Sequence, residues 1–286
     1  MAHRQVIAHR GASAYAPENT LPAFALAVQQ TAGCVEHDLQ VTKDAVLVCL
    51  HDPTLERTTN VRDVFPGRGR DVQEGGDTIR HWFVHDFTLA EVRQLDAGSW
   101  FGPMFAAARI PTYDELLEWS HNLVDVLTEV KDVELYLKFG FDPLELCVGS
   151  LERHGRLAAA RDAGVIVQSF HEPTVRRAFR RLSPRVPVAL LVEPSDSALL
   201  GDRAKVAAIA DFANGIGPGK AILADRPAVV DWAHGVGLRV TPWTFRASST
   251  GAFPNVAAEV KHYLDDLHVD AVITDHPDIA VSTRVA

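Results

Sequence analysis

Two histidines each stand at the end of a short apolar run near the start of the chain. His9 precedes Arg10 in VIAHR, and His51 precedes Asp52 in LVCLHD. Because imidazoles titrate near neutral pH, two of them flanking a phosphodiester can act as general base and general acid. A guanidinium such as that of Arg10 is a rigid fork that fits two phosphate oxygens. These residue types are typical of a site that moves protons around a phosphate.

Three acidic residues on strand-like runs predict a divalent cation beside these histidines. Glu36 and Asp38 alternate with His37 in VEHDL, so on a strand both acids face one way and His37 the other. Glu129 has a comparable place in LTEVK, and Lys131 follows on the same face. Adjacent carboxylates repel each other unless a cation separates them. Carboxylate oxygens with waters favour Mg²⁺ or Ca²⁺ over zinc.

The elements that must position these residues are short strands alternating with helical segments. The apolar runs that predict strands are 5–8, 34–40, 46–50, 125–131, 165–168, 186–192, 213–216, 237–243 and 270–274. This alternation is typical of parallel β/α units.

The short link between two of these runs decides the predicted topology. Only about five residues join 34–40 to 46–50, too few for a parallel crossover, so 46–50 is predicted to return as a hairpin arm. The other eight strands predict an α/β fold, a (β/α)8 TIM barrel with a hairpin on its second strand. An open doubly wound sheet is the alternative, but no GxGxxG or Walker loop follows the first run.

Residues 53 to about 111 interrupt the alternation with a stretch dense in Gly, Arg and Asp. This stretch is too long for an ordinary loop, which predicts an insertion at the barrel mouth. The pattern Thr88-x-x-Glu91 is a capping box and predicts one short helix at about 88–96. Because barrel sites lie at the carboxyl ends of strands, we expect the insertion to border the pocket. Residues 1–286 are predicted to form a single TIM-barrel domain, of which the insertion is a part.

The overall composition restricts the partners of the chain. Its 286 residues are 47% hydrophobic and 23% charged, which is ordinary globular composition, with a formal net charge of −9. A negative field repels nucleic acid, so we expect no nucleic-acid partner. A small-molecule phosphodiester, the partner that the histidines and Arg10 suggest, would need the local positive charge of residues such as Arg10 and Lys131. No apolar run reaches about 18 residues, and no apolar leader precedes the first strand, so we expect a cytoplasmic protein without a membrane span.

Seven blocks of the sequence, in order from residue 9 to residue 278, resemble the signature blocks of the glycerophosphodiester phosphodiesterase family. They are HRGASAYAPENTLPAF, VEHDLQVTKD, LVCLHDPTLERTT, LTEVK, VQSF, TPWTF and VDAVITDHPD. The resemblance implies a TIM barrel that hydrolyses glycerophosphodiesters to sn-glycerol 3-phosphate and an alcohol. It further implies a metal-dependent reaction of glycerol and lipid metabolism, in which water or the neighbouring glycerol hydroxyl attacks the phosphorus.

The resemblance also implies roles for individual positions. The matched residues are His9 and His51 as the catalytic pair, Glu36, Asp38 and Glu129 as ligands of one Mg²⁺ or Ca²⁺, Arg10 and Lys131 at the phosphate, and Trp243 as an aromatic at the mouth. Phe170 is a second candidate for substrate contact, although it could equally pack. Arg246 stands where a smaller polar residue is common and could alter head-group preference. Which histidine is acid and which is base stays open.

Two polar segments take a structural interpretation. Glu18 and Asn19 lie in the PENT segment, which is foremost a predicted helix start, although Asn19 could also reach the metal. Asp275, near Pro277, is expected to shape the end of the last strand, and a role in the site is the alternative.

Three other functions remain open on the sequence. One is a lysophospholipase D-like barrel acting on lysolipids, and a second is a non-catalytic barrel that binds phosphodiesters. A third is a metal-dependent aldolase-type barrel, which would need a base placed for carbon acid chemistry.

Overall fold

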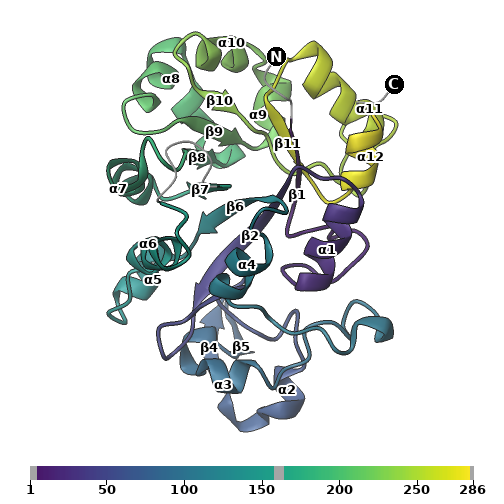
Figure 1. Cartoon of the computed structure of the whole chain (residues 1–286), viewed down its shortest axis with the longest axis vertical. Helices are drawn as coiled ribbons and strands as arrows, with labels where there is room; N and C mark the ends of the chain where they lie inside the picture. Colours follow the sequence, from purple (N-terminus) through teal and green to yellow (C-terminus); the bar gives the residue numbers. More distant parts are fainter. Residues whose placement is uncertain (1–4, 158–163, 284–286) are drawn as a thin grey trace.

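The computed structural model describes residues 5–157 and 164–283, and within them eight parallel strands form a barrel (Figure 1). The strands are β1 (Gln5–Ala8), β2 (Cys34–Val41), β6 (Asp125–Val130), β7 (Val165–Ser169), β8 (Val188–Val192), β9 (Gly215–Pro218), β10 (Arg239–Val240) and β11 (Ala271–Thr274). Each strand from β1 to β9 pairs with the next in this order, and β1 also pairs with β11. The backbone after β10 completes the barrel, because Phe245 N donates to Ile273 O at 2.9 Å. The predicted (β/α)8 barrel is confirmed.

The predicted hairpin on the second strand is also present. Strand β3 (Leu47–Cys49) runs antiparallel to β2, with Leu39 opposite Cys49 and Val41 opposite Leu47. Leu50 N then donates to Asp38 O at 3.0 Å. The hairpin therefore returns the chain to the middle of β2 and leaves His51 beside Asp38.

The register between β2 and β6 decides which side chains enter the barrel. Asp38 is paired with Glu129, so two acids lie next to each other on the inner face. His37 points the other way, where its Nε2 lies 2.9 Å from Thr128 Oγ1 and its ring packs against Tyr113. A small apolar cluster fills the barrel interior below the acids; it consists of Ile7, Cys34, Leu127, Ala271 and Ile273.

Helices surround the barrel (Figure 1) and cover the outward faces of its strands. They are α1 (Leu21–Gln29), α4 (Tyr113–Trp119), α5 (Val133–Leu137), α6 (Pro143–Arg153), α7 (Glu172–Leu182), α8 (Arg203–Ile209), α9 (Lys220–Asp225), α10 (Ala228–His234), α11 (Val256–Lys261) and α12 (Pro277–Ser282). Thr20 caps α1 through a hydrogen bond from Ala23 N, as a threonine before a helix does. Within the described ranges, none of the helices has the length and apolar character needed to cross a bilayer.

The insertion after β3 contains more regular structure than the single helix predicted for it. Helix α3 (Leu89–Val92) begins at the predicted Thr88 capping box but ends before residue 96. The prediction missed α2 (Val61–Val64) and a two-stranded hairpin of β4 (Arg70–Glu74) and β5 (Asp77–His81). Most of the hairpin's residues are exposed, so no apolar alternation marks it. The Gly-Gly pair at its turn, with φ of +59° and +97°, was the available signal.

Candidate active site

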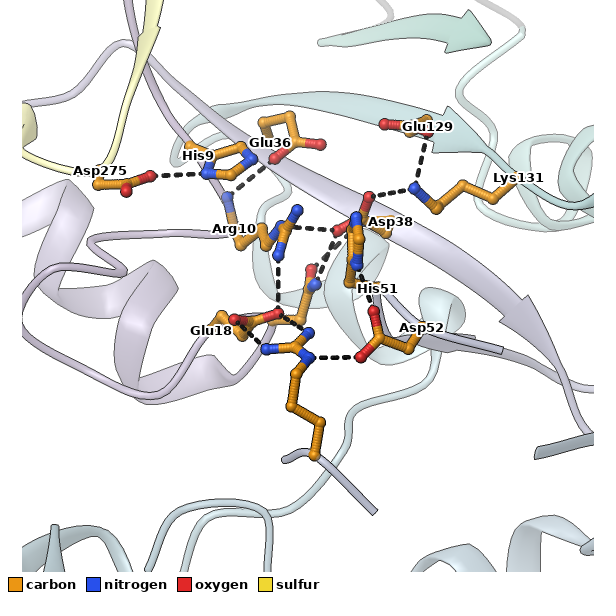
Figure 2. A network of polar contacts seen from close by, with 12 residues as sticks. His9, Arg10, Glu18, Glu36, Asp38, His51, Asp52, Glu129, Lys131 and Asp275 are labelled. Atoms are coloured by element: carbon orange, nitrogen blue, oxygen red, sulfur yellow. Dashed lines mark hydrogen bonds and ion pairs between the residues drawn. The ribbon is translucent and has the colours of Figure 1, made fainter. Parts of the chain in front are cut away.

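Three buried carboxylates gather on the inner face of the barrel (Figure 2). Glu36 and Asp38 come from β2, and Glu129 comes from β6. One oxygen of each residue lies within 4.8 Å of one oxygen of each of the others. The two-residue spacing on β2 and the β2–β6 register together produce this cluster, because inward-facing positions on adjacent parallel strands meet side by side.

The cluster lacks enough positive charge to balance three carboxylates. Burial raises the pKa of Glu36 well above its usual value, and the charges of Asp38 and Glu129 raise it further. Burial likewise raises the pKa of Glu129 to about 7, although Lys131 opposes this. Burial would also raise the pKa of Asp38, but Arg10 and Lys131 hold it well below its usual range. A divalent cation would relieve this repulsion, and three carboxylate oxygens fit Mg²⁺ or Ca²⁺.

Neighbouring donors orient these carboxylates. The backbone N–H of Arg10 donates to Glu36 Oε2 at 2.8 Å, and Asn19 Nδ2 donates to Asp38 Oδ2 at 2.9 Å. The Lys131 ammonium lies 3.1 Å from Glu129 Oε1 and 3.4 Å from Asp38 Oδ1. Asn19 therefore contacts the acidic cluster, and it also directly precedes Thr20, the residue that caps α1.

The turn after β1 presents Arg10 to the same place. Arg10 has a φ of 53° and Gly11 a φ of +84°, both in the left-handed region. A Cβ on Gly11 would come within 2.6 Å of the Ala23 backbone, so only glycine fits there. The Arg10 side chain forms an ion pair with Asp38 (Nε–Oδ2 3.2 Å) and donates from Nη1 to Glu18 Oε1 at 2.9 Å.

Both histidines are held by a carboxylate at the same ring nitrogen (Figure 2). His9 Nδ1 lies 2.7 Å from Asp275 Oδ1, and His51 Nδ1 lies 2.5 Å from Asp52 Oδ1. A neutral imidazole that donates from Nδ1 keeps Nε2 as a proton acceptor. Burial, followed by the charge of Arg10, lowers the pKa of His9 below its usual value, while Asp275 opposes the shift.

A cavity joins these groups to an aromatic wall on the far side of the barrel mouth. Phe170 follows β7 and Trp243 lies beyond β10; their rings meet edge to face at 5.5 Å. Trp243 Nε1 donates to Gly217 O at 2.7 Å, which fixes the indole. Arg246 also lines this cavity, and its Nε lies 3.4 Å from Asp275 Oδ2.

The insertion does not line this cavity, which corrects the expectation that it borders the pocket. In the described part of the chain, the lining residues come from the barrel strands and the loops that follow them. One residue of the insertion, Arg57, nevertheless contacts partners of the reactive groups. That side chain donates to Glu18 and to Asp52 behind the reactive groups.

Eight of the nine predicted site residues line one cavity, and the ninth, Asp38, contacts two of them, Arg10 and Lys131. The seven polar ones lie at the acidic cluster and the histidines, and Trp243 and Phe170 form the opposite wall. Sequence reasoning missed the roles of Glu18, Asp52, Arg57 and Asp275 as partners of the reactive groups. For Asp52 the adjacency to His51 was a signal. For Asp275 the only signal was its place at the end of the last strand.

Comparison with known proteins gives a consistent result. Residues 9–279 match the model of the glycerophosphoryl diester phosphodiesterase family. YhdW of Bacillus subtilis, provisionally named a glycerophosphodiester phosphodiesterase, is 36% identical over 96% of each chain. A glycerophosphodiester phosphodiesterase of the same organism is 32% identical over 96% of this chain and 84% of its own length.

A solved structure extends the likeness to the fold. A phosphodiesterase of Oleispira antarctica, determined in complex with the product sn-glycerol-3-phosphate, superposes with a TM-score of 0.75 at 26% identity. The match covers 99% of this chain and 97% of the other.

Proposed function

The chain belongs to the glycerophosphodiester phosphodiesterase family, and from this premise we propose how its residues carry out the reaction. A glycerophosphodiester is cleaved to sn-glycerol 3-phosphate and an alcohol. Glu36, Asp38 and Glu129 would hold a divalent cation that assists the cleavage, and His9 and His51 transfer the protons. The observation that carries the proposal is the pair of carboxylate-held imidazoles next to a buried three-carboxylate cluster.

The acidic cluster is the proposed cation site. Its three oxygens, each from a different carboxylate, provide the hard ligands that Mg²⁺ and Ca²⁺ prefer, and waters or substrate would complete the shell. When bound, such a cation neutralises phosphate charge and polarises an oxygen attached to phosphorus. The donors from Arg10 and Asn19 keep the carboxylates turned inward for this purpose.

Arg10 and Lys131 are proposed to bind the phosphate. Both cations lie within ion-pair distance of Asp38, on the side of the cluster that faces the cavity. The guanidinium can donate two parallel hydrogen bonds to phosphate oxygens, and the ammonium adds a point charge. Charge that develops on the phosphate oxygens during cleavage would strengthen both contacts.

The two histidines are proposed to divide the proton transfers. His9 accepts the proton of the attacking oxygen at Nε2, because its lowered pKa keeps the ring neutral near pH 7. His51 then donates from Nε2 to the leaving alkoxide as the bond between phosphorus and that oxygen breaks. Asp275 and Asp52 hold the rings by Nδ1 and stabilise them when they are protonated.

The aromatic wall is proposed to contact the organic parts of the substrate. Phe170 and Trp243 present an apolar surface across the cavity from the phosphate-binding groups. The glycerol or the leaving group can pack against these rings, while Arg246 and Glu193 supply polar contacts at the same end.

The decisive experiment incubates the protein with glycerophosphoethanolamine and measures sn-glycerol 3-phosphate. We expect product without EDTA, no product with EDTA, and recovery on adding back Mg²⁺ or Ca²⁺.

Glu36→Gln should weaken cation binding in calorimetry, because it removes one anionic ligand. Full activity in EDTA, or unchanged affinity in this variant, would exclude the cation site. Choline release from lysophosphatidylcholine without turnover of the deacylated diester would favour a lysolipid substrate instead.

A further inference from the structure

One arginine of the insertion connects the two halves of the proposed catalytic machinery. Every nitrogen of the Arg57 guanidinium has a carboxylate partner: Nε donates to Asp52 Oδ2, Nη1 to Glu18 Oε2 at 2.9 Å, and Nη2 to Glu18 Oε1 at 2.7 Å. A bidentate contact with one carboxylate and a third bond to another leave the fork a single orientation.

Each of these two carboxylates also holds a reactive group. The other oxygen of Asp52 is the partner of His51 Nδ1 at 2.5 Å, and Glu18 Oε1 accepts from Arg10 Nη1 at 2.9 Å (Figure 2). Arg57 is therefore connected to the proposed acid, His51, through the side chain of Asp52. It is connected to the proposed phosphate-binding residue, Arg10, through the side chain of Glu18. It does not line the cavity itself.

The positive charge of Arg57 helps to keep both carboxylates ionised. Burial would raise the pKa of Glu18, but the contacts with Arg57 and Arg10 hold it below its usual value. Burial also opposes ionisation of Asp52, whose pKa is nevertheless well below its usual range because of His51 and Arg57. Without Arg57, Glu18 would keep one cationic partner and Asp52 would depend on His51 alone.

The backbone around Arg57 is built to hold it still. Leu55 is buried, and its N–H donates to Trp82 O at 2.9 Å; Thr59 Oγ1 donates to Leu55 O at 2.7 Å. Thr58, next to Arg57, is also buried. The Arg57 side chain is 43% exposed, whereas that of Glu18 is 13% exposed. The insertion thus anchors the arginine and presents it from the solvent side to carboxylates that are largely enclosed.

We propose that Arg57 is a positioning residue that sets the orientation of His51 through Asp52 and of Arg10 through Glu18. This is the route by which the insertion contributes to the reaction, although it lies outside the cavity. The inference rests on the proposed function, because it takes His51 and Arg10 as the groups that act on the phosphodiester.

The test compares Arg57→Gln with Arg93→Gln, a matched loss of an arginine elsewhere in the insertion. Arg93 pairs with Glu115 at 2.6 Å on the surface and does not line the cavity. We expect Arg57→Gln to lower kcat/KM by ~10²-fold, with kcat reduced and KM raised, because both a proton donor and a phosphate ligand lose their alignment. Arg93→Gln should leave both constants unchanged. Arg57→Lys should recover part of the activity, since one ammonium replaces only part of the fork.

Two further measurements separate positioning from general stability. In the Asp52→Asn background, the loss of kcat/KM caused by Arg57→Gln should be smaller than in the wild-type background by a factor of about five or more, because the route to His51 is already broken. Equal effects in both backgrounds, or a loss matched by Arg93→Gln, would overturn the proposal. Thermal unfolding of all variants checks that the fold is retained.

An NMR measurement keeps the inference testable without turnover. The Nδ1–H signal of His51, assigned by its disappearance in His51→Asn, should shift in Arg57→Gln and stay in place in Arg93→Gln. An unchanged signal in both would refute the link to His51. If the wild-type protein does not turn over any glycerophosphodiester, the proposed function fails, while this shift still decides whether Arg57 positions the ring.

Discussion

The two histidine–aspartate pairs reach the same geometry by different routes. His51 and Asp52 are adjacent in the sequence, so a local turn after β3 creates their contact. His9 and Asp275 are 266 residues apart and meet because the first and last strands of the barrel pair. The first pair is backed by Arg57 from the insertion and the second by Arg246 from the loop after β10. Closure of the barrel is thus a condition for one half of the proposed acid–base chemistry and not for the other.

The pairs also differ in their access to water. The His9 ring is 12% exposed and the His51 ring 32% exposed. A hydrogen bond in the drier place is electrostatically stronger, so Asp275 should matter more to His9 than Asp52 does to His51. The more open position of His51 suits an acid that must regain a proton from solvent after each turnover.

The largest expected effect comes from removing either ring. His9→Ala and His51→Ala should each reduce kcat by about 10²–10⁴-fold, the range for loss of one proton-transfer group. Steady-state kinetics with glycerophosphoethanolamine would measure this, with circular dichroism to verify the fold. If one variant keeps nearly the wild-type rate, the two pairs are not equivalent and the acid–base assignment is wrong for that ring.

A smaller effect is expected from the aspartates. Asp275→Asn and Asp52→Asn should each lower kcat on the order of 10²-fold, because the ring can then turn away from its productive orientation. We expect Asp275→Asn to be the more severe, given the burial of the His9 pair. A more severe effect of Asp52→Asn would reverse the ranking and indicate that Arg57, not burial, dominates.

The pH profile should distinguish the pairs by its direction. Burial and Arg10 lower the pKa of His9, and Asp275 raises it, so removing Asp275 lowers that pKa further. If His9 must be neutral to accept a proton, the acid limb of kcat/KM moves to lower pH in Asp275→Asn. The same limb should stay in place in Asp52→Asn. A shift in the opposite direction would assign the acid limb to another group.

A third histidine serves as a contrast, since it lies on β2 but faces away from the cavity. Burial lowers the pKa of His37 to about 4, so the unfolded chain takes up a proton below about pH 6.5 while the folded chain does not. The contribution of His37 to the free energy of unfolding is therefore complete above pH 6.5 and is lost as the pH falls towards 4. Between pH 7 and pH 5 this amounts to about 2 kcal/mol of unfolding free energy.

Urea unfolding at the two pH values would measure this loss, with His37→Leu as the variant that lacks it. The other titrating groups are common to both proteins, so they cancel in the comparison. We expect little change in turnover. An identical pH dependence in both proteins would show that His37 is not the group responsible.

Much of the site could be predicted from the sequence because its residues carry local signals. The spacing of Glu36 and Asp38 on a strand determines that they share a face, and the apolar runs before His9 and His51 place each at a strand end. The five-residue link after β2 excluded a parallel crossover, which made the hairpin and the count of eight strands predictable.

The partners of these residues carried no such signal. Glu18 was taken for part of a helix start, Asp275 for the end of a strand, and Arg57 for one of many arginines in an irregular segment. Their contacts join residues that are 5 to 266 positions apart in the chain. No pattern within a window of sequence contains that information.

The sequence by itself determined the alternation of strands and helices, the hairpin, and the residue types able to bind a cation and move protons. It did so because these depend on side-chain period, turn length and chemistry, which are local properties. Only the tertiary structure decided that Asp275 holds His9, that Arg57 supports two carboxylates, and that the insertion lies outside the cavity. Those facts depend on the path of the chain in three dimensions, including barrel closure and strand register, and most of the side chains concerned are far apart in the sequence.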